Sequence, residues 1–245
     1  MIGGWAHRLM FLHPSANRRH DPLTTNDVDI LFKVSRTSVP LAQRLATAGF
    51  AARPREERPP AADYVHSEHP ASPIEFLAPD VRSRKPSTPT KDIGGVSATT
   101  IKGLDLLLAA PWSIELTSAL GFPVEEKLVV QVPNALAFVL HKLVVSTQRR
   151  DRYKREKDLL YAFDTLVLFA GSDGHLREDG PSVRKALSRS AVEKLRAMIP
   201  ELAATSDAVR GAAQIAAQSG RVAPPLADQV GSTLAAALRR YLNDE

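Results

Sequence analysis

Hydrophobic residues in the first half of the chain gather in short runs rich in β-branched and aromatic side chains, which is the pattern of β-strands. These runs occupy 28–32, 50–54, 62–66, 74–77 and 127–132. Between the first two runs, residues 40–48 predict a helix that ends at Gly49, since glycine commonly follows a helix C-terminus,. Strands that alternate with a helix indicate an α/β arrangement.

The second half of the chain predicts helices, starting from Pro133, which suits the first turn of a helix,. The expected helices cover 135–146, 151–169, 181–198, 203–218 and 226–242, and Ser182 is the expected cap of the third. Residues 79–95 are rich in Ser, Pro, Thr, Lys and Arg, so they predict an exposed loop, with Pro79 ending the preceding strand,. The predicted fold class is α+β: a small mixed β-sheet core with helices over 1–132, then a helical C-terminal domain over 133–245.

Composition excludes several classes of protein. The 245 residues include no cysteine, so disulfides, thiolate zinc sites and a cysteine nucleophile are ruled out,. No apolar run reaches the roughly 18 residues that cross a bilayer, so no membrane partner is expected,. The opening MIGGWAHRLMFLHP lacks the basic region that starts a signal peptide,. The expected location is therefore the cytoplasm.

The net charge of +5 permits an anionic partner, and most of the excess lies in one segment,. Residues 142–158 hold seven basic and three acidic side chains. Tyr153 is the aromatic residue among these cations, so the segment could line a groove for an RNA or DNA acceptor,. A solvated helix face with local ion pairs is the alternative.

The strongest candidate for chemistry is the segment TTNDVDILF, residues 24–32. On a strand, Asp27 and Asp29 project to one face because side chains alternate. Two carboxylates on one side repel each other unless a cation lies between them, and oxygen ligands of this kind suit Mg²⁺ next to phosphates. An exposed strand end with two solvated carboxylates is the alternative reading.

Two further features favour the magnesium site. Gly3-Gly4 stands directly before a helix-like segment, where glycines let backbone N–H groups approach phosphates,. Glu75 lies within an apolar strand, where a carboxylate is costly unless it is exposed or paired,. If a neighbouring strand brings Glu75 beside Asp27 and Asp29, the three carboxylates could hold two Mg²⁺ ions and activate a hydroxyl. An edge-strand acid that faces water is the alternative for Glu75.

With Gly3-Gly4, then Asp27-Val28-Asp29, then an acid on a later strand, the chain resembles the DNA polymerase β-type nucleotidyltransferase superfamily. The segment AFVLHKLVVSTQRRDRYKREKDLLYAF resembles the helical lysine, arginine and Lys-Asp motif of AbiEii-like and related bacterial nucleotidyltransferases. The positions matching that motif are Lys142, Arg149 or Arg150, Lys157 and Asp158. The resemblance covers roughly residues 2–165.

The resemblance implies transfer of a nucleoside monophosphate from an NTP, such as ATP, to an acceptor hydroxyl with release of pyrophosphate. It implies that Gly3 and Gly4 bind the triphosphate and that Asp27 and Asp29 ligate Mg²⁺. Glu75 would be the third carboxylate, either a metal ligand or the base for the acceptor hydroxyl.

The helical motif implies further roles in nucleotide binding. Lys142 and Lys157 would neutralise phosphate charge, and Asp158 would orient a lysine or an arginine. The acceptor is left open among tRNA or another RNA, a protein and a small molecule.

Three departures from the family pattern leave alternatives open. Only Met1 and Ile2 precede the glycine pair, 22 residues separate Gly4 from Asp27, and the third acid is Glu rather than the more frequent Asp. A start that lies upstream of Met1, or a degenerate copy, would explain the first departure. The alternatives are an inactive nucleotide- or RNA-binding module with the same fold, and a toxin of a toxin–antitoxin pair that acts on tRNA.

His66 and His69 have an H-x-x-H spacing. The surrounding segment predicts a loop or weak strand, and no third ligand is evident, so no metal is expected there.

Overall fold

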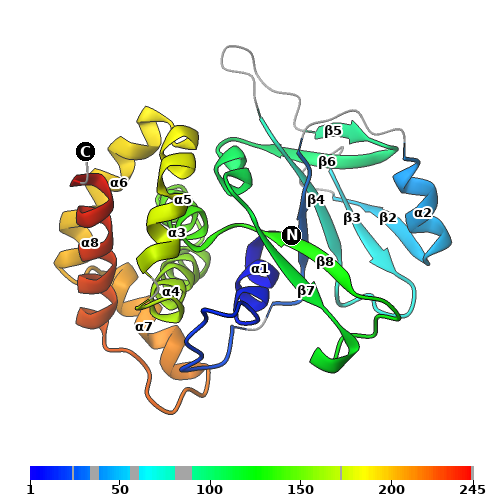
Figure 1. Cartoon of the computed structure of the whole chain (residues 1–245). Coiled ribbons are helices and arrows are strands. Elements are labelled where there is room, and N and C mark those ends of the chain that lie inside the picture. Colours follow the sequence, from blue (N-terminus) through cyan, green and yellow to red (C-terminus); the bar gives the residue numbers. More distant parts are fainter. Residues whose placement is uncertain (24, 34–38, 56–60, 81–89, 172, 244–245) are drawn as a thin grey trace.

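The computed structural model describes residues 1–23, 25–33, 39–55, 61–80, 90–171 and 173–243 (Figure 1). These residues form a mixed α/β fold in which the strands lie mainly in the first half and the long helices in the second, as the sequence predicts. In Figure 1 the larger sheet lies on the right, the helices of the second half on the left, and α1 with the β7–β8 pair between them.

The larger sheet has six strands, and its central strand β4 pairs with three of the others. The strands are β1 (Val28–Leu31), β2 (Phe50–Pro54), β3 (Ala62–His66), β4 (Ile74–Pro79), β5 (Thr90–Ile93) and β6 (Val96–Ile101). Their order is β2-β3-β4-β6-β5, with β1 also paired to β4. The β1–β4 and β4–β6 pairs are parallel, and the others are antiparallel. A separate antiparallel pair joins β7 (Trp112–Leu116) to β8 (Leu128–Val132).

The described residues form these α-helices: α1 (Gly3–Met10), α2 (Leu41–Thr47), α3 (Ala135–Ser146), α4 (Arg152–Leu168), α5 (Asp173–Ala186), α6 (Arg189–Ala203), α7 (Asp207–Gln218) and α8 (Ala227–Asn243). Two short 3₁₀ segments, η1 (Leu104–Leu108) and η2 (Ser118–Leu120), flank β7. Polar side chains cap several helices: Asn134 accepts from the Ala137 N–H, and Asp151 accepts from the Lys154 N–H,. None of the described helices is both long and apolar enough to cross a bilayer.

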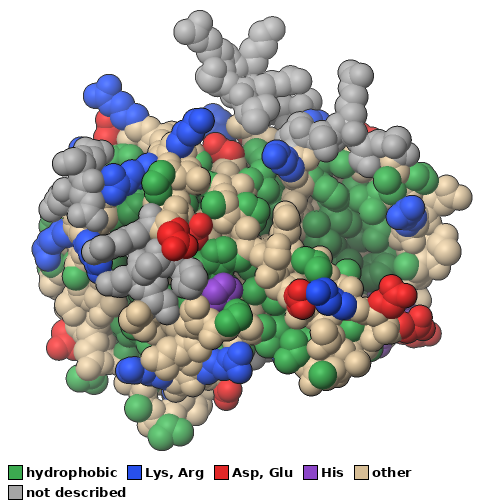
Figure 2. All heavy atoms as spheres, viewed as in Figure 1, with side chains coloured by type: hydrophobic (Ala, Val, Ile, Leu, Met, Phe, Trp, Pro, Cys, Tyr) green, Lys and Arg blue, Asp and Glu red, His purple; other side chains and the backbone are tan. Residues whose placement is uncertain are grey.

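The two faces of the larger sheet have different neighbours, because residues alternate along each strand. One face carries a hydrophobic cluster that includes Tyr64 and Phe76, covered in part by α2. Figure 2 shows hydrophobic side chains lining a hollow over this part of the molecule. On the other face, Leu77 packs with Ile2 and with Leu104 and Leu107 of η1. The second face therefore turns toward α1.

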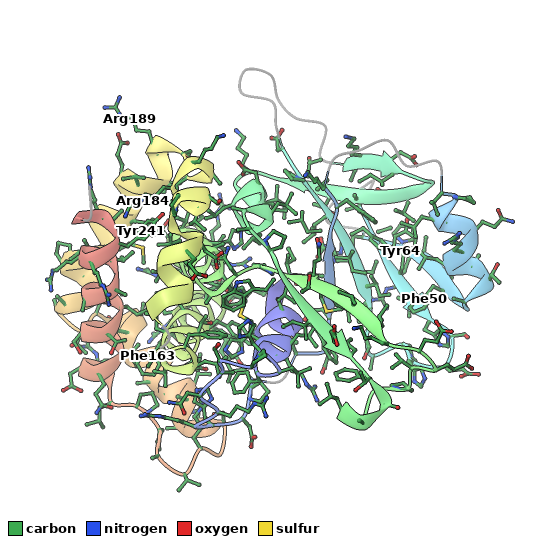
Figure 3. All side chains as sticks on the ribbon, in the orientation of Figure 1. Phe50, Tyr64, Phe163, Arg184, Arg189 and Tyr241 are labelled. Atoms are coloured by element: carbon green, nitrogen blue, oxygen red, sulfur yellow. The ribbon has the colours of Figure 1, made fainter. Side chains whose placement is uncertain are left out.

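The largest hydrophobic cluster joins α1 and the β7–β8 pair to the helices of the second half. It contains residues from both sides of position 132. Two polar contacts between distant segments accompany it: Asp164 of α4 binds Arg221 through both oxygens, at 2.7 and 2.5 Å, and the Trp112 indole donates to Asp179 at 3.0 Å. At the far end of the helices, Arg184 of α5 lies over the Tyr241 ring of α8 (Figure 3).

Three local predictions are wrong. Within the predicted loop 79–95, Thr90–Ile93 forms β5. The strand before this loop ends at Pro79, as predicted. Residues 81–89 of that prediction lie outside the described residues. The predicted helix 181–198 is instead parts of two helices: Pro181 lies inside α5, and α6 begins after its cap Ser188. The next helix starts at Asp207, because Ala203 still belongs to α6.

Candidate active site

Three carboxylates stand in a row across three adjacent strands on the face of the sheet that turns toward α1. Asp29 of β1 is directly opposite Glu75 of β4, and Glu75 is directly opposite Asp63 of β3. Residues paired in register share a face, so these side chains lie side by side. Asp27 stands one residue before β1, and its Oδ1 accepts a 2.5 Å hydrogen bond from the Thr25 hydroxyl. Sequence reasoning identified three of these four acids and missed Asp63.

Arg55 binds the two acids of the row other than Asp29, which are Glu75 and Asp63. It follows β2, and its guanidinium donates to both oxygens of Glu75, at 3.0 and 2.9 Å. Its Nε donates to Asp63 at 2.8 Å, and its Nη2 donates to the same oxygen. Glu75 is thus paired, as a carboxylate within an apolar strand requires, but its partner is a cationic side chain. No pattern in the sequence pointed to Arg55.

Asp29, unlike Glu75, has no arginine partner among the described residues, and it lies directly against the first glycine of α1. Burial raises the pKa of Asp29 to about 7, and the negative charges of Asp27 and Glu75 add to the shift, while Lys142 and Arg55 oppose it,. The row of acids therefore carries excess negative potential at Asp29. A site of this kind favours a bound cation or a proton.

The glycine pair begins α1 and lies directly against the two aspartates. Gly3 has φ +67°, and a Cβ at this position would lie 2.0 Å from Oδ2 of Asp29. A Cβ on Gly4 would lie 2.7 Å from the Thr25 side chain and from the Tyr161 hydroxyl. The Ile2 N–H donates to the Asp29 carbonyl at 2.9 Å and fixes β1 beside the start of the helix. The glycine pair thus lets the start of α1 approach Asp29 and Thr25 more closely than any other residue type would allow.

The predicted lysine, arginine and Lys-Asp residues come together on α3 and α4. The Lys142 ammonium donates to Oδ1 of the buried Asp158 at 2.6 Å, and Arg149 donates to Oδ2 at 3.0 Å. These two cations hold the pKa of Asp158 below its usual range, against the effect of burial. Of the two arginine candidates, Arg149 makes this contact. The Lys142 ammonium also lies 4.8 Å from the centre of the Tyr161 ring.

Lys157 links this network to the aspartates. Burial lowers the pKa of Lys157, and the negative charge of Asp27 opposes that change. The Lys157 ammonium lies 5.6 Å from the centre of the Tyr161 ring. Gly3, Gly4, Asp27, Asp29, Lys142 and Lys157 are therefore neighbours in space, as one site requires.

A buried aromatic group that sequence reasoning missed lies behind the glycines. His7 of α1 is completely buried, and its ring centre is 5.0 Å from that of Tyr161. Neither ring nitrogen of His7 nor the Tyr161 hydroxyl has a hydrogen-bond partner among the described residues. Burial lowers the pKa of His7 well below its usual value, so the ring is neutral.

Asp27, Asp29 and Glu75 do not form a compact three-ligand metal group in this structure. Among the described residues, the group that places three candidate ligand atoms within 4.8 Å of one another is His66, Glu68 and His69. The inference that the H-x-x-H pair lacks a third ligand is therefore wrong, because the turn after β3 brings Glu68 beside both rings. The Glu68 N–H donates to Nδ1 of His66 at 3.1 Å, so that nitrogen is already engaged.

The charge of Asp29 predicts how the stability of the metal-free protein depends on pH. The group binds a proton more tightly in the folded chain, with a pKa of about 7 against 3.8, so its stabilising contribution is lost as the pH rises from about 4 to about 7,. Asp29→Asn does not titrate, so we expect it to gain roughly 2–4 kcal/mol over the native protein between pH 5 and pH 8. Urea unfolding in EDTA measures this difference.

Asp105→Asn is the matched control, since it removes an exposed carboxylate elsewhere. The difference in the free energy of unfolding between Asp105→Asn and the native protein should stay constant with pH. Parallel pH profiles for Asp29→Asn and the native protein would show that Asp29 is an ordinary solvated acid.

Comparison with known proteins identifies the family of the chain. The family model described as nucleotidyltransferase matches residues 1–181, which include all of the site residues above. No curated protein and no solved structure matches the chain. Since the match extends over most of its length, the chain belongs to the nucleotidyltransferase family.

Proposed function

We propose that this protein is a magnesium-dependent nucleotidyltransferase of the DNA polymerase β-type superfamily, which moves a nucleoside monophosphate from an NTP to an acceptor hydroxyl. The observation that carries the proposal is Asp29, a half-buried carboxylate with a raised pKa, beside Asp27 and against the first glycine of α1. In the reaction the acceptor oxygen bonds to the α-phosphorus, the bond from that phosphorus to pyrophosphate breaks, and the hydroxyl proton leaves to water or a base.

The donor set at this site fits magnesium. Asp27 and Asp29 supply carboxylate oxygens, which Mg²⁺ prefers, and Mg²⁺ is commonly held by one or two carboxylates together with substrate phosphates. The raised pKa of Asp29 indicates a place where added positive charge would relieve repulsion,. Bound Mg²⁺ would neutralise the triphosphate and make the acceptor hydroxyl more acidic.

The chain's own residues would bind the triphosphate. The first N–H groups of α1 have no partner within the helix, and Gly3 and Gly4 present them without a side chain in front,. Lys157 interacts electrostatically with Asp27 and would neutralise phosphate charge. Lys142 would do the same from a fixed position, because Asp158 holds its ammonium and Arg149 holds Asp158. We place the nucleotide between the parts formed by 1–132 and 133–245, with its phosphates over the glycine turn.

Glu75 has a conditional role in this proposal. Arg55 binds both of its oxygens, so Glu75 acts as a metal ligand or as the base for the acceptor hydroxyl only after Arg55 moves away. This pairing also favours a second candidate function, a nucleotide-binding module without transfer activity. The two functions differ in whether binding of an NTP is followed by release of pyrophosphate.

Calorimetric titration of each NTP with Mg²⁺ tests the site. We expect native protein to bind at least one NTP only with Mg²⁺, and Asp27→Asn/Asp29→Asn to lose that binding by more than about a hundredfold, since each lost charge contact is worth roughly 1.5–3 kcal/mol. The control Glu125→Gln/Glu126→Gln removes the same charge from two exposed positions and should bind normally. If well-folded native protein bound no NTP, or the double variant bound as tightly, the assignment would be wrong.

A further inference from the structure

A pocket of about 970 Å³ opens beside the proposed site, at the other end of α1 from the glycine pair. Its walls come from the segment after α1, the start of α4, and the end of α7 with the loop that follows. The lining residues include Arg18, Arg19, Leu23, Tyr153, Lys157 and Arg221. Phe11 and Leu12, which follow α1 directly, also line it. Since α1 has eight residues, this part of the lining is roughly 12 Å from Gly3,.

Two walls of the pocket connect it to the aspartates. Lys157 lines the pocket and also interacts with Asp27. Leu23 is buried in its wall and stands two residues before Thr25, whose hydroxyl binds Asp27. A ligand that extends from the pocket past Lys157 and Leu23 would therefore approach Asp27.

The pocket is strongly cationic. Three arginines and Lys157 line it, and Asp21 is the acid among the lining residues. Arg221 is built in: its side chain is 5% exposed and is held by the completely buried Asp164. The Nε of Arg221 is buried and has no hydrogen-bond partner among the described residues. Arg18 and Arg19 are exposed at the rim. Such a set suits a ligand with several negative charges.

Tyr153 adds a stacking surface at the mouth of the pocket. It stands in the first turn of α4 and is 57% exposed, which is unusual for a large aromatic side chain,. The exposed basic residues Arg150 and Lys154 lie near it in sequence. Exposed aromatic rings among cations are how proteins bind single-stranded nucleic acids: bases stack on the rings while cations contact the phosphates.

We propose that this pocket binds the acceptor, and that the acceptor is the terminal nucleotides of a single-stranded nucleic acid. The assignment rests on the proposed function, because it supplies the hydroxyl that attacks the NTP. Pockets for small ligands usually measure about 300–1,000 Å³, so this one is at the upper end of that range,. Arg18 and Arg19 then contact backbone phosphates of the acceptor, and Tyr153 stacks on a base.

Fluorescence anisotropy with a labelled 12-nucleotide single-stranded RNA tests the proposal on the full chain. We expect native protein to bind it, and Arg18→Ala/Arg19→Ala to bind about tenfold more weakly with a salt dependence smaller by roughly 1.4 logarithmic units per decade, as for two lost phosphate contacts. Tyr153→Ala should weaken binding by about tenfold with the salt dependence unchanged, because stacking is not ionic. Magnesium-dependent NTP binding should change less than about twofold in these variants.

The control Arg189→Ala/Lys194→Ala removes two exposed charges from α6, whose first turn lies at the opposite end of the helical region (Figure 3). It should bind the RNA as the native protein does. Failure of native protein to bind the RNA, or equal loss in the control, would overturn the proposal. So would weaker NTP binding in Arg18→Ala/Arg19→Ala with RNA binding intact, since the pocket would then belong to the nucleotide. RNA binding without NTP binding would instead refute the transfer function and leave the nucleic-acid pocket standing.

Discussion

Asp29→Asn is expected to lower the turnover number for nucleotidyl transfer by about a thousandfold. Asparagine keeps the shape of the side chain against Gly3 but removes the charge that the proposed Mg²⁺ site depends on. A catalytic metal contributes several kcal/mol of transition-state stabilisation, and each 1.36 kcal/mol is a factor of ten in rate. Pyrophosphate release from an NTP at saturating Mg²⁺, with an acceptor that supports turnover, measures the change.

The same substitution separates chemistry from folding, because in the metal-free protein it should stabilise the fold at neutral pH. Asp105→Asn, at an exposed position, should change neither turnover nor stability. Turnover within about tenfold of native for Asp29→Asn would remove Asp29 from the reaction and favour the binding module without transfer activity.

Arg221→Ala is expected to cause the largest loss of stability, about 3–5 kcal/mol in the free energy of unfolding. Its guanidinium is the bidentate partner of Asp164, whose side chain is completely buried in α4. Removing the arginine leaves a buried carboxylate with His20 at 3.6 Å as its remaining ion-pair contact among the described residues. Urea denaturation followed by circular dichroism measures the loss.

Arg189→Ala is the matched control, since its ion pair with Glu193 is exposed on α6. Exposed pairs contribute about 0–1 kcal/mol, so this variant should unfold close to the native midpoint. Replacing both partners, as Asp164→Leu/Arg221→Met, should recover most of the stability, because no buried charge remains. A loss below about 1 kcal/mol for Arg221→Ala would show that water reaches Asp164.

The fold class and most elements were predictable because they rest on local pattern. The run 28–32 is rich in β-branched and aromatic side chains, the mainly apolar helix 135–146 follows Pro133, and both form where expected. The β5–β6 hairpin was missed because β5 is a partly exposed edge strand with Lys91 and Asp92 in its middle, so its composition is that of a loop. Its turn uses Gly94 and Gly95, both at positive φ.

The helix predicted at 181–198 failed for a different reason. Proline usually marks a helix start, but Pro181 lies in the second half of α5,. The helix start that forms is at Ser188, whose side chain accepts a 3.2 Å hydrogen bond from the Ala191 N–H. Ser182 and Ser188 are both plausible helix caps, and the sequence alone does not rank them.

Membership in the nucleotidyltransferase family, predicted from the glycine pair and the two aspartates, is confirmed by the family match over residues 1–181. The two glycines are adjacent in sequence, and the two aspartates follow the alternation of a strand, so both pairs can be recognised from local sequence. Arg55 and Asp63 were out of reach, because their relation to Glu75 depends on how β2, β3 and β4 pair. That pairing is a long-range property, and residues 55 and 63 alone carry no motif.

The two-faced strand β4 also bears on how this family can diverge. Glu75 faces the carboxylate row while its neighbours Ile74 and Phe76 face the hydrophobic cluster. One inserted or deleted residue within β4 would exchange these roles, placing a phenyl ring among the acids and a carboxylate in the apolar layer. Length variation in descendants of this chain should therefore be tolerated in the connections and purged within β4, so alignments of relatives can be anchored there without gaps.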